Sequence, residues 1–116
     1  MKLSHEKTKD GLTLVHCAGR LTLVELQHVH DPLVKQLGRQ VYRTRVLLDL
    51  SQVEYLDSSG IGWLVVSYKR FRQAKGTIVF HSPSPFVKQL LDMMRLDLVL
   101  PVVADEEAAR ARALQE

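Results

Sequence analysis

The sequence of 116 residues predicts a single α/β domain built on a mixed, mostly parallel sheet. Three observations lead to this fold class. Short apolar runs typical of strands alternate with segments whose apolar residues recur at helical spacing. An Asp-Gly pair separates the first two strand-like runs, which favours an antiparallel hairpin. Each later strand is followed by a helix, and such crossovers make strands parallel. We therefore expect the order β-β-α-β-α-β-α-β-α, with about five strands and about four helices.

The first two elements are predicted as strands at residues 2–8 and 12–18. Lys9-Asp10-Gly11 lies between them, and this composition is typical of a tight hairpin turn. Gly19 is expected to end the second strand, because glycine weakens strand interiors.

A helix is predicted to follow, opened by Thr22 and Glu25 in the spacing of a capping box. Its middle contains Asp31-Pro32, and a proline inside a helix removes a hydrogen bond and crowds the preceding turn. Two outcomes are open: a kinked helix, or a restart with Asp31 as cap and Pro32 as first residue. The residues that recur at helical spacing are Leu23, Leu26, His30, Leu33, Val34 and Leu37.

Residues 46–50 form a nearly continuous apolar run, as expected of a central strand covered on both faces. A short polar loop separates this strand from a helix that begins at the Ser58-Ser59 pair. Lys75-Gly76 then turns the chain into a second central strand at residues 77–80.

The remaining elements are predicted from helix-start signals and one short apolar run. Ser84 is expected to cap a helix that Pro85 begins. Residues 98–100 are predicted as the last strand, and Asp105 as the cap of a final helix at residues 106–114.

Composition indicates one compact unit over residues 1–116. With 46% hydrophobic and 25% charged residues, the chain can bury a core without disulfides or metal. Its single cysteine, Cys17, lies in an apolar strand and is interpreted as a buried hydrophobic residue, which suits a reducing cytoplasm. The start of the sequence lacks a signal peptide's apolar core, and no apolar run is long enough to span a bilayer. We expect a cytoplasmic protein without membrane insertion.

The formal net charge of +3 is modest, and the basic residues are scattered without an aromatic platform. Ordinary solvated charge explains them better than a nucleic-acid site, so no direct nucleic-acid binding is expected.

Ser58 and Ser59 are predicted to lie at a helix N-terminus, where backbone N–H groups and the helix dipole stabilise negative charge. One of them could simply cap the helix. Gly60 and Gly62 follow, but the chain lacks a GxGxxG or GxxxxGK[ST] run, so a nucleotide-binding loop and a cofactor are not expected. We interpret the glycines as allowing close approach to a neighbouring backbone.

The helix that starts at these serines has an inner and an outer side. Trp63 and Val66 fall on the outer side, which suggests a patch for binding a partner. The residues expected to meet the sheet are Ile61, Leu64, Val65 and Tyr68.

A serine hydrolase is the main competing interpretation from another class. A nucleophilic serine needs a base and an orienting acid, and none of the five histidines belongs to a GxSxG motif. His28 and His30 are two residues apart and do not share a helix face, which argues against a metal pair. His81 ends a central strand near the expected edge of the site. We predict no enzyme activity, no catalytic residue and no metal.

Three segments carry a resemblance to a known family. Asp57-Ser58-Ser59-Gly60-Ile61-Gly62, preceded by Leu48-Asp49-Leu50 and followed by Ser82-Pro83-Ser84-Pro85, resembles the STAS domain of the bacterial anti-sigma-factor antagonists, or anti-anti-sigma factors. The similarity extends from the first hairpin to the last helix. It implies a STAS-like α/β fold.

The resemblance also implies a function. Such an antagonist binds an anti-sigma factor that is a serine kinase with an ATPase-like fold, which frees a sigma factor and regulates transcription. The kinase then phosphorylates the antagonist, and the complex dissociates. The matching serine is Ser58, with Ser59 as the fallback, and the implied state is a monomer or weak dimer. The alternative is a non-phosphorylated STAS interaction module of a stress-signalling or lipid-transport complex.

One segment departs from the family pattern. Gly19-Arg20-Leu21-Thr22 stands where the family has glycine, an acid, leucine and aspartate, so the local charge here is more positive. The expected partner-binding residues are Arg20, Thr22, Asp57, Ser58, Ser59, Gly60, Gly62, Trp63 and Val66.

Overall fold

A computed structural model describes residues 1–115 and confirms the α/β class. Its sheet has the order β1-β2-β3-β4-β5, in which β1 and β2 are antiparallel and all other neighbours are parallel. The elements are β1 (Lys2–Lys7), β2 (Leu12–Leu21), α1 (Leu23–Leu26), α2 (Pro32–Leu37), the 3₁₀ helix η1 (Arg39–Arg43), β3 (Arg45–Leu56), α3 (Ser58–Gln73), β4 (Thr77–His81), α4 (Pro85–Met93), the 3₁₀ helix η2 (Leu96–Leu98), β5 (Val102–Val103) and α5 (Glu106–Gln115).

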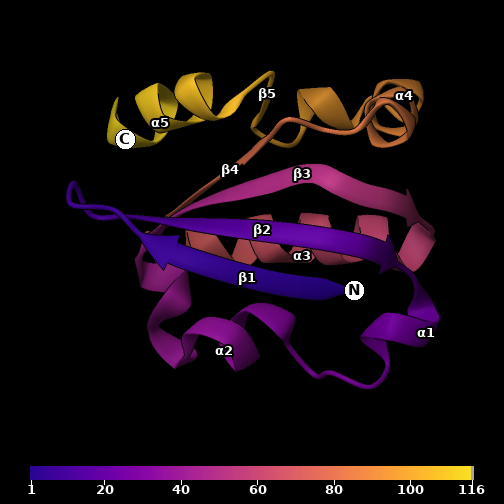
Figure 1. Cartoon of the computed structure of the whole chain (residues 1–116), viewed down its shortest axis with the longest axis horizontal. Coiled ribbons are helices and arrows are strands. Elements are labelled where there is room, and N and C mark those ends of the chain that lie inside the picture. The colour runs from indigo at the N-terminus through magenta and orange to yellow at the C-terminus, as the bar shows by residue number, and fades with distance from the viewer. Residues whose placement is uncertain (116) are drawn as a thin grey trace.

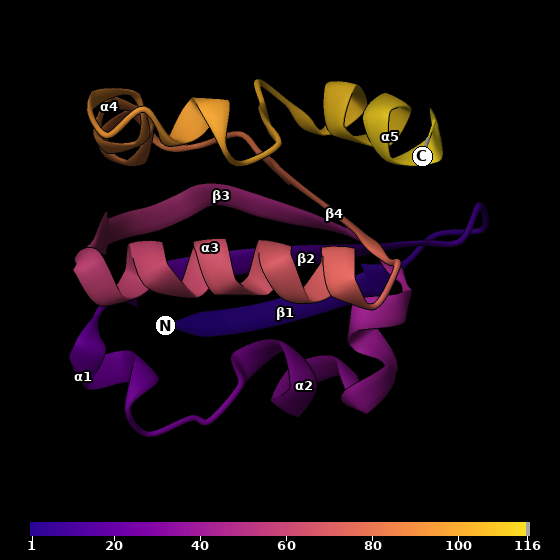
Figure 2. The same cartoon turned by 180° about the vertical axis from the view of Figure 1, so that it is seen from behind.

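Helices cover both faces of the sheet (Figures 1 and 2). The main core lies between the sheet and α3, with Val46 and Leu48 of β3 and Phe71 of α3 fully buried. Leu47 points to the other face, where it packs in a second cluster with Ala109 of α5. Alternation along a strand thus explains why the apolar run of β3 is continuous, because both faces are covered.

The segment after β2 folds as two short helices, so the chain restarts at Asp31-Pro32 and does not kink. Oδ1 of Asp31 accepts hydrogen bonds from the N–H groups of Leu33 (3.1 Å) and Val34 (3.2 Å), which caps α2. Pro32 occupies the first turn of the helix, where its missing N–H costs nothing.

The capping box predicted at the start of α1 is wrong. Thr22 takes the N-cap position, but its side chain makes no capping hydrogen bond. The carboxylate of Glu25 instead pairs with the N-terminal ammonium of Met1 at 3.2 Å. The ion pair with Met1 holds the Glu25 carboxylate away from the Thr22 N–H, and the carboxylate of Asp57 accepts from the N–H of Leu23.

Both central strands on the N-terminal side extend further than predicted. β2 continues past Gly19, which has a φ of +96° beside a register shift in the pairing with β3. β3 runs through the expected polar loop to Leu56, which pairs with Leu21. The pairing and the burial of both leucines keep these polar stretches extended.

The last strand was predicted at residues 98–100, and this is wrong. Leu98 belongs to η2, and the strand β5 starts only after Pro101. Proline has no N–H to donate, but the Pro101 carbonyl accepts from the N–H of Phe80 at 2.9 Å. Proline therefore joins the sheet as an acceptor at the start of the strand.

The C-terminal helices follow their sequence signals with one difference. Asp105 caps α5, since its Oδ1 accepts from the N–H of Ala108 at 2.8 Å. Ser84 takes the N-cap position of α4, but its hydroxyl donates to the Val53 carbonyl at 2.7 Å and does not cap the helix. Within residues 1–115 no helix is long and apolar enough to cross a membrane.

Candidate functional site

The site begins with Asp57, which links two helices through one carboxylate. Its Oδ1 accepts from the N–H of Gly60 in α3, and its Oδ2 accepts from the N–H of Leu23 in α1, both at 3.0 Å. Asp57 is therefore the N-cap of α3 and also holds the first turn of α1 against it. The hydrogen bond from Leu23, followed by that from Gly60, lowers the pKa of the Asp57 carboxyl, so the group is ionised near neutral pH.

Because Asp57 provides the cap, neither serine is needed for it. Ser58 is the first residue of α3 and is exposed, whereas Ser59 is half-buried. The helix behind them runs for 16 residues, and its dipole favours negative charge at this end. The Ser58 hydroxyl is thus a surface group in a position that tolerates an added anion.

The two glycines of the site play different roles. A Cβ on Gly60 would lie 2.2 Å from the carbonyl oxygen of Leu21, so this residue lets α3 approach the end of β2. The expectation of close backbone approach is confirmed there. It is wrong for Gly62, whose Cβ would meet nothing within 4 Å.

The outer side of α3 is partly as predicted. Val66 is 44% exposed, but Trp63 is half-buried and packs against the main core. On the inner side Leu64 and Phe71 are buried, whereas Ile61 is only half-buried. Ser67 is also buried, although helical spacing directs it away from the face that carries Ile61 and Leu64, so that expectation is wrong. Trp63 belongs to a shallow groove of about 320 Å³ between α3 and the α1–α2 connection, lined by Leu26, Val29, His30, Pro32, Ser59, Gly62, Trp63, Val66 and Arg70.

Two apolar side chains near the serines were not predicted to be exposed. Leu23 is 57% and Val24 62% exposed on α1, although helical spacing placed Leu23 in the core. The Leu23 N–H bonds to Asp57, so this apolar surface lies beside the start of α3. Its proximity to Ser58 depends on that long-range hydrogen bond and has no signal in the sequence.

Arg20 does not join this group, whereas Thr22 does. Thr22 immediately precedes α1, beside Asp57. Leu21 is buried toward α3, so alternation directs Arg20 to the opposite face of the sheet. The Arg20 guanidinium carbon lies 4.7 Å from the centroid of the Tyr55 ring, and that ring is 5.3 Å from the ring of Phe86 in α4.

His81 also lies away from the serines, so its expected position near the site edge is wrong. It is buried in register with Asp49, on the face opposite to α3, and its Nδ1 is 2.8 Å from the Ser82 hydroxyl. Burial lowers the pKa of His81. The histidine is therefore neutral near neutral pH and out of reach of Ser58.

Two further features bear on chemistry elsewhere in the chain. Cys17 is buried as predicted, and its burial raises the pKa of the thiol to about 12, which makes it unreactive. The structured residues 1–115 contain no group of three or more histidine, cysteine, aspartate or glutamate side chains arranged to hold a metal ion.

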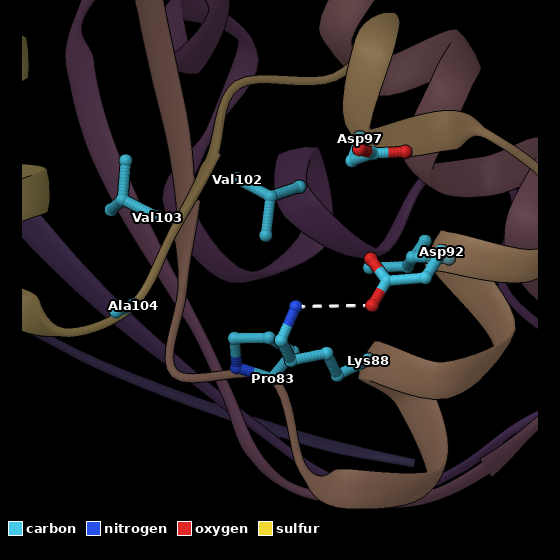
Figure 3. A pocket seen from close by; sticks show the side chains of 8 residues that line it. Pro83, Lys88, Asp92, Asp97, Val102, Val103 and Ala104 are labelled. Atoms are coloured by element: carbon cyan, nitrogen blue, oxygen red, sulfur yellow. Dashed lines mark hydrogen bonds and ion pairs between the residues drawn. The ribbon is translucent and has the colours of Figure 1, made fainter.

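A separate cavity of about 220 Å³ lies between α4 and β5 (Figure 3). Its walls are mainly apolar, and the Lys88 ammonium in its lining pairs with Asp92 at 3.1 Å. The volume is below that of ordinary ligand pockets, about 300–1,000 Å³. The cavity is therefore smaller than expected of a cofactor site.

Comparisons with known proteins agree with this arrangement. The family model described as "Mlab, STAS domain" matches residues 4–102. The BtrV protein of Bordetella bronchiseptica, assigned as an anti-sigma factor antagonist, is 27% identical over 111 residues, which are 96% of this chain and 93% of BtrV. The anti-sigma F factor antagonist of Paenibacillus polymyxa is 28% identical over 99 residues, which are 83% of this chain and 81% of that protein.

Solved structures show the same fold. An anti-sigma-factor antagonist (STAS) domain protein from Planctomyces limnophilus is 26% identical and covers 94% of this chain and 96% of its own, with a TM-score of 0.73. SpoIIAA, a Bacillus cell fate determinant solved in its phosphorylated form, is 16% identical and covers 96% of this chain and 98% of its own, with a TM-score of 0.64. Family model, relatives and fold agree over nearly the whole chain, and the protein belongs to the STAS domain family.

Proposed function

We propose that this protein is an anti-sigma-factor antagonist that regulates transcription by binding an anti-sigma factor. Its relatives from Bordetella bronchiseptica and Paenibacillus polymyxa are named for that role. The anti-sigma factor is also a serine kinase with an ATPase-like fold, and the antagonist acts in the cytoplasm as its ligand and substrate, not as an enzyme. It works as a monomer or weak dimer without a cofactor.

The partner-binding surface consists of the first turns of α3 together with α1. It presents Leu23 and Val24 as exposed apolar side chains, with Val66 further along α3. Adjacent to them are Thr22, Asp57 and the two serines. Apolar residues surrounding a few polar groups are typical of protein interfaces, in which large buried anchors supply most of the affinity.

The observation that carries the proposed switch is the exposed hydroxyl of Ser58 at an N-terminus already capped by Asp57. A phosphate there would add about −1.5 to −2 charges beside an ionised carboxylate. The helix dipole tolerates that charge in the free protein. In a complex the same charge would have to lose its water next to Asp57, which is costly. Phosphorylation therefore releases the partner without refolding the antagonist.

The switch predicts opposite effects for two substitutions at one position. Ser58→Asp should weaken binding to the anti-sigma factor at least about ten-fold while the thermal unfolding curve stays that of wild type. Ser58→Ala should bind as wild type and resist release by kinase and ATP. Titration calorimetry with the anti-sigma factor captured from the native lysate measures both affinities.

Ser59→Ala is the matched control, because the modification is assigned to the first serine. This variant should still accept phosphate, as mass spectrometry after incubation with the kinase would show. Phosphate on Ser59 alone would move the site by one residue. Modification of neither serine would contradict the switch and leave a non-phosphorylated STAS interaction module as the function.

Trp63 is predicted to be an anchor for the partner. Trp63→Ala should weaken binding by about 2 kcal/mol, because indole side chains in interfaces often contribute that much. Met93→Ala, at a side chain 72% exposed on α4, is the control and should leave affinity unchanged. Because Trp63 also packs against the core, the folded fraction of each variant must be measured by circular dichroism. Unchanged affinity in a folded Trp63→Ala protein would remove Trp63 from the interface.

A further inference from the structure

A small polar pocket lies at the end of the molecule where α3 finishes, far from Ser58. Its volume is about 140 Å³, and it follows the edge of β4 at Thr77 and Ile78. The α3 residues that line it, Tyr68 to Arg72, lie about 15–21 Å along the helix from Ser58. Its lining residues are Tyr68, Phe71, Arg72, Gly76, Thr77, Ile78, Pro101 and Arg112.

Two arginines reach this pocket from opposite faces of the sheet. Arg72 comes from the last turns of α3, and Arg112 comes from the last turn of α5. Figure 2 shows both helices finishing at this end of the molecule, on either side of β4. The helix dipoles favour a cation at each place separately. They do not explain why two cations line the same small space.

Within residues 1–115, no carboxylate neutralises the charges of these arginines. The pocket lining contains no aspartate or glutamate. The Arg72 Nη1 donates to the Tyr68 hydroxyl at 3.3 Å, which leaves the hydroxyl hydrogen free to donate in turn. Among residues 1–115 neither Arg72 nor Arg112 forms an ion pair, whereas Arg110 of the same helix pairs with Asp10 at 3.0 Å.

The strand edge adds a backbone donor. The N–H of Phe80 donates to Pro101 on the β5 side, so alternation points the Ile78 N–H to the same side. β5 pairs with β4 only at Phe80 and His81, and no other strand of the described chain lies beside Ile78 there. The Ile78 N–H is thus directed toward the pocket edge between the two arginines.

We propose that this pocket binds a phosphoryl group. Two guanidinium groups, a phenolic hydroxyl and a backbone N–H are all donors, and guanidinium groups match the geometry of phosphate oxygens. A volume of about 140 Å³ admits a phosphoryl group but leaves the rest of a larger molecule outside. The ligand is inorganic phosphate or the phosphate of a small nucleotide, and the site is independent of the partner surface at Ser58.

Nuclear magnetic resonance of the ¹⁵N-labelled protein tests the site, with inorganic phosphate titrated against sodium chloride at equal ionic strength. Phosphate should shift the Ile78 amide and the Nε–H signals of Arg72 and Arg112 along one saturable curve. Arg112→Gln should weaken phosphate binding about ten-fold, as loss of a charged hydrogen-bond donor does. Arg72→Gln should do the same.

The matched control is Arg39→Gln, which removes the same charge in η1 but does not line the pocket. Its phosphate affinity should stay within about two-fold of wild type, since only long-range charge is lost. If Arg39→Gln and Arg112→Gln weakened phosphate binding equally, the binding would reflect general charge attraction, and the proposed site would be wrong. Shifts no larger than those caused by chloride would also overturn it. If Arg72→Gln fails to fold, the Arg112→Gln variant still tests the site, because Arg112 is exposed and its loss should leave the fold intact.

Adenosine monophosphate serves as a second probe to separate the two sources of the phosphoryl group. Tighter binding than inorganic phosphate, weakened equally by Arg112→Gln, would support a nucleotide phosphate as the ligand. Equal affinity of the two probes, with the same dependence on Arg112, would support the phosphoryl group alone. Binding of both probes that is insensitive to Arg112→Gln would contradict the proposal.

Discussion

Gly60→Ala should destabilise the folded protein by about 3 kcal/mol or more, because a rigid backbone contact leaves no room for a methyl group. The added Cβ would lie 2.2 Å from the Leu21 carbonyl oxygen and 3.0 Å from the Leu56 Cβ. Relief would require α3 to move away from the paired ends of β2 and β3. Urea unfolding followed by circular dichroism measures the change in free energy.

Gly62→Ala, two residues further along the same helix, is the matched control. Its new Cβ meets nothing within 4 Å, so the variant should gain up to about 1 kcal/mol from the better helix propensity of alanine. The two substitutions are identical in chemistry and opposite in expected sign. A Gly60→Ala protein as stable as Gly62→Ala would mean that α3 does not contact β2 as described.

Phe71→Ala should cost about 3–5 kcal/mol, as expected for deletion of a fully buried aromatic ring. Phe71 has no exposed surface, and its ring meets the ring of Tyr42 edge-on, with centroids 5.0 Å apart. It therefore connects the last turns of α3 to η1 and to the main core. Thermal and urea unfolding of the purified variant test the magnitude.

Phe86→Ala makes the same chemical change on a ring that is 43% exposed on α4. Its loss should cost about 1 kcal/mol, mainly from the lost contact with Tyr55, because little area returns to water. A similar cost for both variants would show that Phe71 is not the anchor of α3.

Local signals in the sequence were sufficient to predict the element order and most element starts. The Asp-Gly turn, the apolar run of β3, the serine pair at the start of α3 and the Asp105 cap all depend on neighbours within a few residues. Such signals act through backbone propensity and capping, which are short-range. They misplaced the last strand because no residue near Pro101 in the sequence indicates that its carbonyl accepts a hydrogen bond from the N–H of Phe80.

The composition of the site was only partly predictable. The serines, Asp57 and Gly60 lie next to one another in the chain, so the sequence placed them together. Arg20 was grouped with them by position alone, but alternation along β2 sends its side chain to the Tyr55 side of the sheet. Leu23 and Val24 were absent from the predicted surface, although both are more than half exposed beside Asp57.

The sequence by itself determined the α/β class, the helix that begins at Ser58 and the position of that serine at a dipole that favours an anion. Only the tertiary structure decided that Asp57 caps two helices, so that the Ser58 hydroxyl is not needed for capping. It also decided that Gly60, and not Gly62, contacts β2, and that Arg72 and Arg112 line one pocket. These contacts join residues far apart in the chain, and their geometry depends on how strands and helices pack, which local propensity does not encode.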